Sequence, residues 1–225
     1  MIWHLNADIS FCELDGRLFF LDIRNDRYFC LPRAVECSIL NYLEAPDHPN
    51  VDLTELVKHN LLSPSETTPY RGAATEIALP SESTVEMPRP HRRVPLDVMR
   101  DVVLAIAMMR WQLKVHCLKL VLQTLIDYRD SRTSPLVEDN AELRQHLWEA
   151  ATTFIRVRPY IPIETRCLID SLSMIRFLAK RGLHAHLVMG IACDPFSAHA
   201  WVQHGPLVLN ETVGMAQAYV PIRVI

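Results

Sequence analysis

The chain has 225 residues, of which 49% are hydrophobic and 22% are charged. This composition is typical of a globular protein with room for one domain or two small ones. The net charge of −3 argues against bulk nucleic-acid binding. The charge is unevenly spread: residues 1–70 hold 5 Lys and Arg against 11 Asp and Glu, a net of −6, and the remainder holds 18 against 15, a net of +3. An acidic first part suits a basic peptide partner, although a solvated acidic face is the simpler reading.

The chain shows no sign of a membrane span or of secretion. Its start lacks the basic, apolar and small-residue pattern of a signal peptide. The longest apolar run, residues 102–109, ends at Arg110 and is shorter than the about 20 residues that a membrane span needs. The six cysteines form no CxxC pair, so we expect reduced thiols, no zinc site and a cytoplasmic location.

The first 60 residues predict a small unit with the order β-β-β-α-α. Asp15-Gly16 is a strong hairpin turn signal, and Pro32 ends the last strand and begins a helix. The expected strands are residues 9–14, 17–23 and 27–31, and the expected helices are residues 32–44 and 53–60.

The middle of the chain changes in composition. The stretch from 63 to 95 is rich in Ser, Thr, Pro and Glu and poor in large apolar residues, which is typical of a linker. We therefore expect a first domain at 1–65, a linker at 66–94 and a second domain at 95–225.

The second domain is expected to be α+β. Residues 96–130 predict two helices or one long bent one, with the methionines and Trp111 packed in the core. Further helices are expected at 137–160 and at 164–183, the latter closed by Gly182, and strands at 184–192, 199–204 and 207–211.

Cys167 and His199 are the candidate catalytic pair. Cys167 falls in the first turn of its helix, with Glu164 and Thr165 as expected caps. Free N–H groups at a helix start lower the pKa of a thiol, and the thiolate is the nucleophile. A histidine on a later strand could act as the base for acyl transfer at a carbonyl. The group that orients the imidazole should be Asn210 or Glu211.

Structural roles are the alternative for Cys167, His199 and the other candidates in this region. Cys167 and His199 could be ordinary buried residues, as cysteines often are. Cys193 is an alternative thiol, but it lies in an expected loop without a helix dipole. His184 and His186 have metal-ligand spacing, but no further ligand set is evident, so we expect no metal and no cofactor.

The last part of the chain resembles the C-terminal half of lasso-peptide maturation B proteins, which are cysteine peptidases of the transglutaminase-like superfamily. The similar elements are "CL..SL....FL...G", "L..GI", "AHAWV" and "VLN(D/E)", in that order. The resemblance covers roughly residues 95–225 and implies a transglutaminase-like, papain-like cysteine peptidase domain. It implies that Cys167 is the nucleophile and His199 the general base. Glu211 stands where the family has Asp, so Asn210 is kept as the fallback.

The first unit resembles the leader-peptide recognition element, a PqqD-like winged-helix module found fused to or beside such peptidases. In that family a leader peptide adds as a strand to the edge of the third strand and rests on the last helix. On this chain the resemblance implies a groove that involves Tyr28, Phe29, Leu56 and Val57. Phe29 and Leu56 could instead pack only inside the unit.

Together these resemblances imply a leader peptidase of a ribosomally synthesised, antimicrobial-type lasso peptide. The partners would be the leader region of a precursor peptide and an asparagine-synthetase-like lasso cyclase that closes the macrolactam ring. The chain has no GxxxxGK[ST] motif, so we expect no ATP binding of its own. Two alternatives use the same residues: a transglutaminase-type acyltransferase, and a non-enzymatic peptide-binding adaptor.

Overall fold

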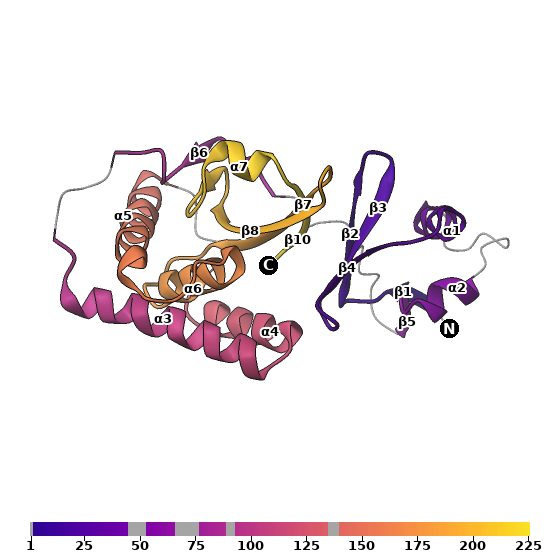
Figure 1. Ribbon diagram of the computed structural model, residues 1–225, viewed down its shortest axis with the longest axis horizontal. Helices are drawn as coiled ribbons and strands as arrows, with labels where there is room; N and C mark the ends of the chain where they lie inside the picture. The colour runs from indigo at the N-terminus through magenta and orange to yellow at the C-terminus, as the bar shows by residue number, and fades with distance from the viewer. Residues whose placement is uncertain (1, 45–52, 66–76, 89–92, 135–139) are drawn as a thin grey trace. The chain divides into compact units, whose positions relative to one another are not determined.

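The computed structural model describes residues 2–44, 53–65, 77–88, 93–134 and 140–225 (Figure 1). Contacts divide the chain into two compact units, Met1–Thr75 and Glu76–Ile225. The architecture is mixed α and β, as the sequence predicted. Among the described residues, no helix combines the length and the apolar character that a membrane crossing needs.

The first unit contains a three-stranded antiparallel sheet in the order β2-β3-β4. The Asp15-Gly16 hairpin turn is confirmed, with φ of 51° and 67° at the two residues. Two strands that the sequence did not predict, β1 and β5, pair with each other. They are the first and the last elements of the unit along the chain. The elements are β1 (Ile2–Leu5), β2 (Ile9–Leu14), β3 (Arg17–Asp22), β4 (Arg27–Cys30), α1 (Arg33–Glu44), α2 (Leu53–Lys58) and β5 (Leu62–Ser65).

The first unit has its own apolar core. Phe20 and Ile39 are fully buried and bring the sheet and α1 together. Leu56 is also fully buried in this core and holds α2 in place. Burial of such a side chain stabilises a fold by about 1.5–3 kcal/mol. Leu56 therefore contributes to the stability of the first unit.

The second unit has a five-stranded sheet in the order β10-β7-β8-β9-β6. Its helix α6 contacts β8 and also α3, α4 and α5, so it lies at the centre of the unit (Figure 1). The elements are β6 (Glu82–Ser83), α3 (Leu96–Val115), α4 (Leu118–Asp130), α5 (Ala141–Val157), a 3-10 turn (Arg158–Tyr160), α6 (Cys167–Ala179), β7 (His186–Ala192), β8 (Ser197–His204), β9 (Leu207–Val208), α7 (Val213–Gln217) and β10 (Val220–Val224).

The central position of α6 follows from its composition. Leu172, Phe177 and Leu178 are 0%, 2% and 0% exposed and point in different directions around the helix. A helix that is apolar around most of its circumference needs neighbours on several sides. The strand-facing side of α6 meets β8, and this contact brings the start of the helix to the sheet.

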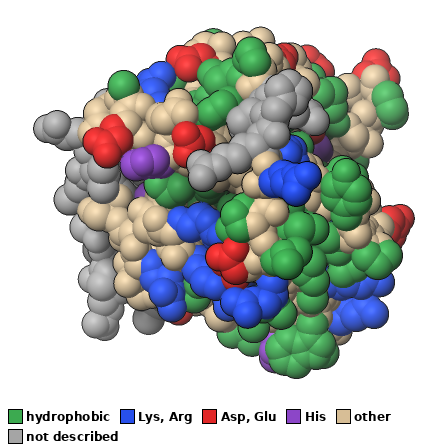
Figure 2. All heavy atoms as spheres, turned by 90° about the vertical axis from the view of Figure 1, so that its left-hand side faces the viewer, with side chains coloured by type: hydrophobic (Ala, Val, Ile, Leu, Met, Phe, Trp, Pro, Cys, Tyr) green, Lys and Arg blue, Asp and Glu red, His purple; other side chains and the backbone are tan. Residues whose placement is uncertain are grey.

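Of the two possibilities expected for residues 96–130, the structure has two helices, which are separated at His116 and Cys117. The burial of α3, however, departs from the expectation. Met109 is buried as expected, but Met108 is 40% exposed and Trp111 is 58% exposed, so the assignment of Met108 and Trp111 to the core is wrong. Figure 2 shows that, on one face of the molecule, hydrophobic side chains lie at the surface among Lys and Arg side chains. The apolar character of α3 extends around more of the helix than its neighbours cover.

Residues 77–88, here called the strap, correct the expected linker at 66–94. They belong to the second unit, where β6 pairs in parallel with β9. The Ser83 hydroxyl donates to the Glu211 carbonyl at 2.6 Å, and the Thr84 hydroxyl donates to the Leu209 carbonyl at 2.6 Å. The Gln203 side-chain amide donates to the Ala78 carbonyl at 2.6 Å. The strap therefore fixes the segment that follows β8.

Candidate active site

Cys167 is the first residue of α6. Arg166 is the N-cap residue and makes no side-chain cap bond, so the expected capping by Glu164 or Thr165 is wrong. Glu164 instead accepts from the Arg166 guanidinium at 2.8 Å. The first N–H groups of α6 are thus left without a cap from the side chain of Arg166, and that of Leu168 lowers the pKa of the Cys167 thiol. The helix end supplies the positive environment that a reactive thiol requires.

His199 lies on β8, opposite Gly190 on β7. Its ring is 5.1 Å from the ring of Tyr219 and 6.2 Å from that of Trp201, measured between centroids. A Cβ atom at Gly190 would lie 2.9 Å from the Trp201 ring and 3.0 Å from Cβ of Tyr219. Glycine at this position therefore lets the two aromatic side chains close in beside the imidazole.

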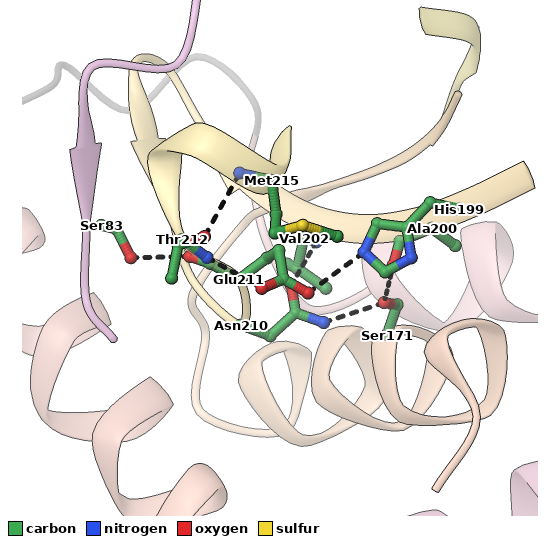
Figure 3. A network of polar contacts seen from close by, with 9 residues as sticks. All are labelled: Ser83, Ser171, His199, Ala200, Val202, Asn210, Glu211, Thr212 and Met215. Atoms are coloured by element: carbon green, nitrogen blue, oxygen red, sulfur yellow. Dashed lines mark hydrogen bonds and ion pairs between the residues drawn. The ribbon is translucent and has the colours of Figure 1, made fainter. Parts of the chain in front are cut away.

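The Glu211 carboxylate holds the imidazole. Its Oε2 lies 3.1 Å from Nε2 of His199, and its Oε1 accepts the N–H of Thr212 at 3.0 Å (Figure 3). A carboxylate only accepts, so Nε2 carries the proton and Nδ1 is left to face Cys167. Thr212 then caps α7, because its hydroxyl accepts the N–H of Met215 at 3.2 Å. Of the two residues left open by the sequence, Glu211 contacts His199.

Asn210 points elsewhere. Its Oδ1 accepts the N–H of Val202 at 2.7 Å, and its Nδ2 donates to the Ser171 hydroxyl at 2.9 Å (Figure 3). Ser171, one turn after Cys167, was not singled out by the sequence, since an isolated serine inside an apolar helix carries no signal.

The electrostatics of the site favour a thiolate–imidazolium pair. The hydrogen bond from His199 lowers the pKa of the Cys167 thiol, with further lowering by the N–H groups of Ala200 and Leu168, while burial opposes them. The hydrogen bond to Cys167 raises the pKa of His199, and Glu211 raises it further against the effect of burial. Each shift favours the charged form of its group. The two groups together resemble an activated nucleophile with its base.

The site is partly accessible from solvent, and Cys167 is half-buried. The His199 side chain is 15% exposed and the Glu211 side chain is 26% exposed. A cavity of about 610 Å³ elsewhere in the unit is lined by Val98, Trp148 and Phe177. Phe177 lies ten residues after Cys167 on α6, about 15 Å along the helix axis. That cavity is therefore separate from the reactive thiol.

The remaining cysteine and histidine candidates lie outside this arrangement. Cys193 follows β7, in the turn before β8. His184 and His186 stack edge to face with their rings 4.9 Å apart, and burial lowers the pKa of His184 to about 4. Among the residues that the structure describes, no group of three or more His, Cys, Asp or Glu could hold a metal ion.

The residues expected to bind a leader peptide all lie in the first unit. Tyr28 and Phe29 are on β4, the outer strand of its sheet, and Phe29 stacks on Phe20 at 5.3 Å. Val57 is 38% exposed on α2, whereas Leu56 is 0% exposed. Leu56 cannot present a surface to a peptide, so its expected contact with a leader is wrong.

Comparison with known proteins places the site in a family. Residues 109–224 match the family described as the transglutaminase-like superfamily. A stretch of 49 residues is 41% identical to the microcin J25-processing protein McjB of Escherichia coli and covers 22% of this chain and 24% of that protein. No solved structure matches the chain. The family match spans more than half of the chain and includes Cys167, His199 and Glu211. The chain therefore belongs to the transglutaminase-like superfamily.

Proposed function

We propose that this protein is a cysteine peptidase that removes the leader from a ribosomally synthesised lasso-peptide precursor. The observation that carries the proposal is the contact chain from Cys167 through His199 to Glu211, at the start of a helix in a transglutaminase-like domain. The local similarity to a microcin-processing protein supports the choice of substrate class.

Cleavage would proceed through a thioester. The Cys167 thiolate attacks the carbonyl carbon of the scissile bond, and N–H groups at the start of α6 are donors available to the oxyanion. The His199 imidazolium gives its proton to the departing core amine, which breaks the C–N bond. Water, deprotonated by His199, then attacks the thioester and releases the leader as a carboxylic acid. Glu211 stabilises the imidazolium and keeps the ring oriented throughout.

The first unit would bind the leader. The outer edge of β4 offers backbone groups for an added strand, and Tyr28, Phe29 and Val57 offer apolar contacts. Binding there would raise the effective concentration of the scissile bond at Cys167. The freed core amine would pass to a separate asparagine-synthetase-like cyclase, which would use ATP to close the macrolactam.

The test is a product analysis of the full chain with its precursor peptide, with and without the cyclase, in H₂¹⁸O that contains a primary amine. Mass spectrometry should find a leader acid with one ¹⁸O at its new carboxylate. A leader carrying the added amine as an amide would instead establish a transglutaminase-type acyltransferase. Intact precursor in every mixture, with leader binding retained, would indicate an adaptor.

A further inference from the structure

Ser171 makes an unusual bond for a buried helical serine. It is 0% exposed, and its hydroxyl donates to the carbonyl of Ala200 on β8 at 2.9 Å. A helical serine commonly bonds to the carbonyl four residues earlier. Ser173, on the same helix and equally buried, does this with Ile169 at 2.6 Å. Ser171 thus joins the nucleophile helix to the histidine strand, whereas Ser173 serves only its own helix.

Asn210 completes this link. Its Nδ2 donates to the Ser171 hydroxyl at 2.9 Å, and its Oδ1 accepts the N–H of Val202 at 2.7 Å (Figure 3). The orientation of the amide is fixed, because the Val202 N–H requires an acceptor. The two side chains form a continuous path from α6 to two points on β8.

At Ala200 and Val202, the edge of β8 that faces α6 is satisfied largely by side chains, beyond the end of its ladder with β9. Alternate residues of a strand present N–H and C=O to the same edge, and here these residues are Ala200 and Val202. The Val202 carbonyl accepts from Leu209 at 2.8 Å, and the Ala200 N–H faces Cys167, where it lowers the pKa of the thiol. Ser171 and Asn210 match the two remaining groups.

Because the side chains of Ser171 and Asn210 take the place of a neighbouring strand beside Ala200, there is room for the Cys167 thiol. The ladder between β8 and β9 covers Gln203 and His204. A strand continued beside Ala200 would lie about 4.8 Å from β8, where Cys167 now contacts both Ala200 and His199. The side-chain link therefore replaces the ladder at the place where the nucleophile must approach.

We propose that Ser171 and Asn210 are positioning residues: they hold the start of α6 against β8 and so set the separation of Cys167 from His199. They act through Cys167 and His199 and not on substrate. The kinetic part of this inference rests on the proposed peptidase function, but the thiol reactivity does not.

The test compares Ser171→Ala with Ser173→Ala in the full chain. Ser171→Ala should lower kcat for leader removal roughly ten- to hundredfold with little change in KM, because small displacements of reacting groups have effects of this size. It should also raise the pH midpoint for alkylation of Cys167 by iodoacetamide, followed by peptide mass spectrometry. Ser173→Ala should leave both the kcat and the midpoint at their wild-type values.

Asn210→Asp is a second variant of nearly the same shape. Its carboxylate cannot donate to Ser171, so the hydroxyl turns toward it and leaves the Ala200 carbonyl unpaired; the effects should follow those of Ser171→Ala. This variant decides the question if Ser171→Ala does not fold. Wild-type kcat and alkylation midpoint in the folded variants would overturn the proposal, as would equal losses in Ser173→Ala. If wild type cleaves no precursor, the proposed function fails, and the alkylation midpoints still decide the positioning role.

Discussion

Glu211 makes use of the methylene that distinguishes it from aspartate. One carboxylate oxygen contacts His199 at 3.1 Å, and the other accepts the N–H of the adjacent Thr212 at 3.0 Å. The longer side chain can fold back to its own backbone and still reach the imidazole. Ser83 holds the Glu211 carbonyl at 2.6 Å, so the start of the side chain is fixed as well. Glutamate can therefore orient the histidine where the family resemblance implies aspartate.

The charge of Glu211 should be visible in the pH dependence of kcat/KM. The active pair is charged, so activity rises as pH passes the lowered pKa of Cys167 and falls as pH passes the raised pKa of His199. Glu211→Gln removes a charge that raises the pKa of His199. The alkaline limb should therefore move to lower pH, and kcat should fall by about a hundredfold, at the lower end of the range of general acid–base contributions.

Glu164→Gln is the matched control, because Glu164 lies near Cys167 in the chain but pairs with Arg166. Its pH profile should coincide with that of the wild type. An unchanged alkaline limb in Glu211→Gln would show that the carboxylate does not act on His199.

Local signals in the sequence were enough to predict the contact between Cys167 and His199. A thiol at a helix start and a histidine on a strand are local features. Local signals could not decide whether Asn210 or Glu211 contacts His199, because the answer depends on how the chain turns after β9. Ser171 could not be found, since its partner Ala200 is 29 residues away and becomes adjacent only when α6 packs on the sheet.

At the scale of elements, prediction succeeded where a segment carries its own pattern. The hairpin of β2 and β3 and the long helices have strong turn signals or periodicity. β1 and β5 were missed because they are short strands that pair across more than fifty residues. The sequence predicted a linker at the strap because the strap is rich in polar residues. Two of them, Ser83 and Thr84, are in fact buried, at 3% and 1% exposed. Their hydrogen bonds to Glu211 and Leu209 are invisible to composition.

The strap yields a prediction about where the catalytic unit begins. A shortened chain of residues 76–225 keeps the strap, and one of residues 95–225 lacks it. Loss of the strap leaves the carbonyls of Leu209 and Glu211 without their hydroxyl donors, and each lost bond costs about 1 kcal/mol. The 76–225 chain should cleave a short peptide that spans the scissile bond, and the 95–225 chain should unfold at lower urea concentration and lose this activity.

Urea unfolding followed by circular dichroism and peptide cleavage followed by mass spectrometry give the two readouts. Equal stability and equal activity of the two shortened chains would mean that residues 77–88 are a linker after all.

At the scale of the whole molecule, we propose that leader binding and bond cleavage belong to different units of the chain. Val57→Asp places a charge on the exposed side of α2, where we propose that the leader peptide binds. It should weaken binding of the leader by about tenfold, the cost of losing one important apolar contact, and raise KM for the precursor. Cleavage of a short peptide without the leader should be unchanged.

Leu40→Asp is the control for Val57→Asp, because Leu40 is similarly exposed, at 40%, but lies on α1. Fluorescence anisotropy with a labelled leader peptide measures both affinities. A leader that binds Val57→Asp as tightly as wild type would place the leader on another surface.

The most direct test of the central claim is leader removal by Cys167→Ala, measured by mass spectrometry beside Cys193→Ala. Cys193 lies in the turn between β7 and β8, which makes it a second thiol of the same unit outside the contact chain. We expect wild type and Cys193→Ala to release the leader, and Cys167→Ala to bind the leader with unchanged affinity and release none. Release of the leader by Cys167→Ala at the wild-type rate would contradict the account.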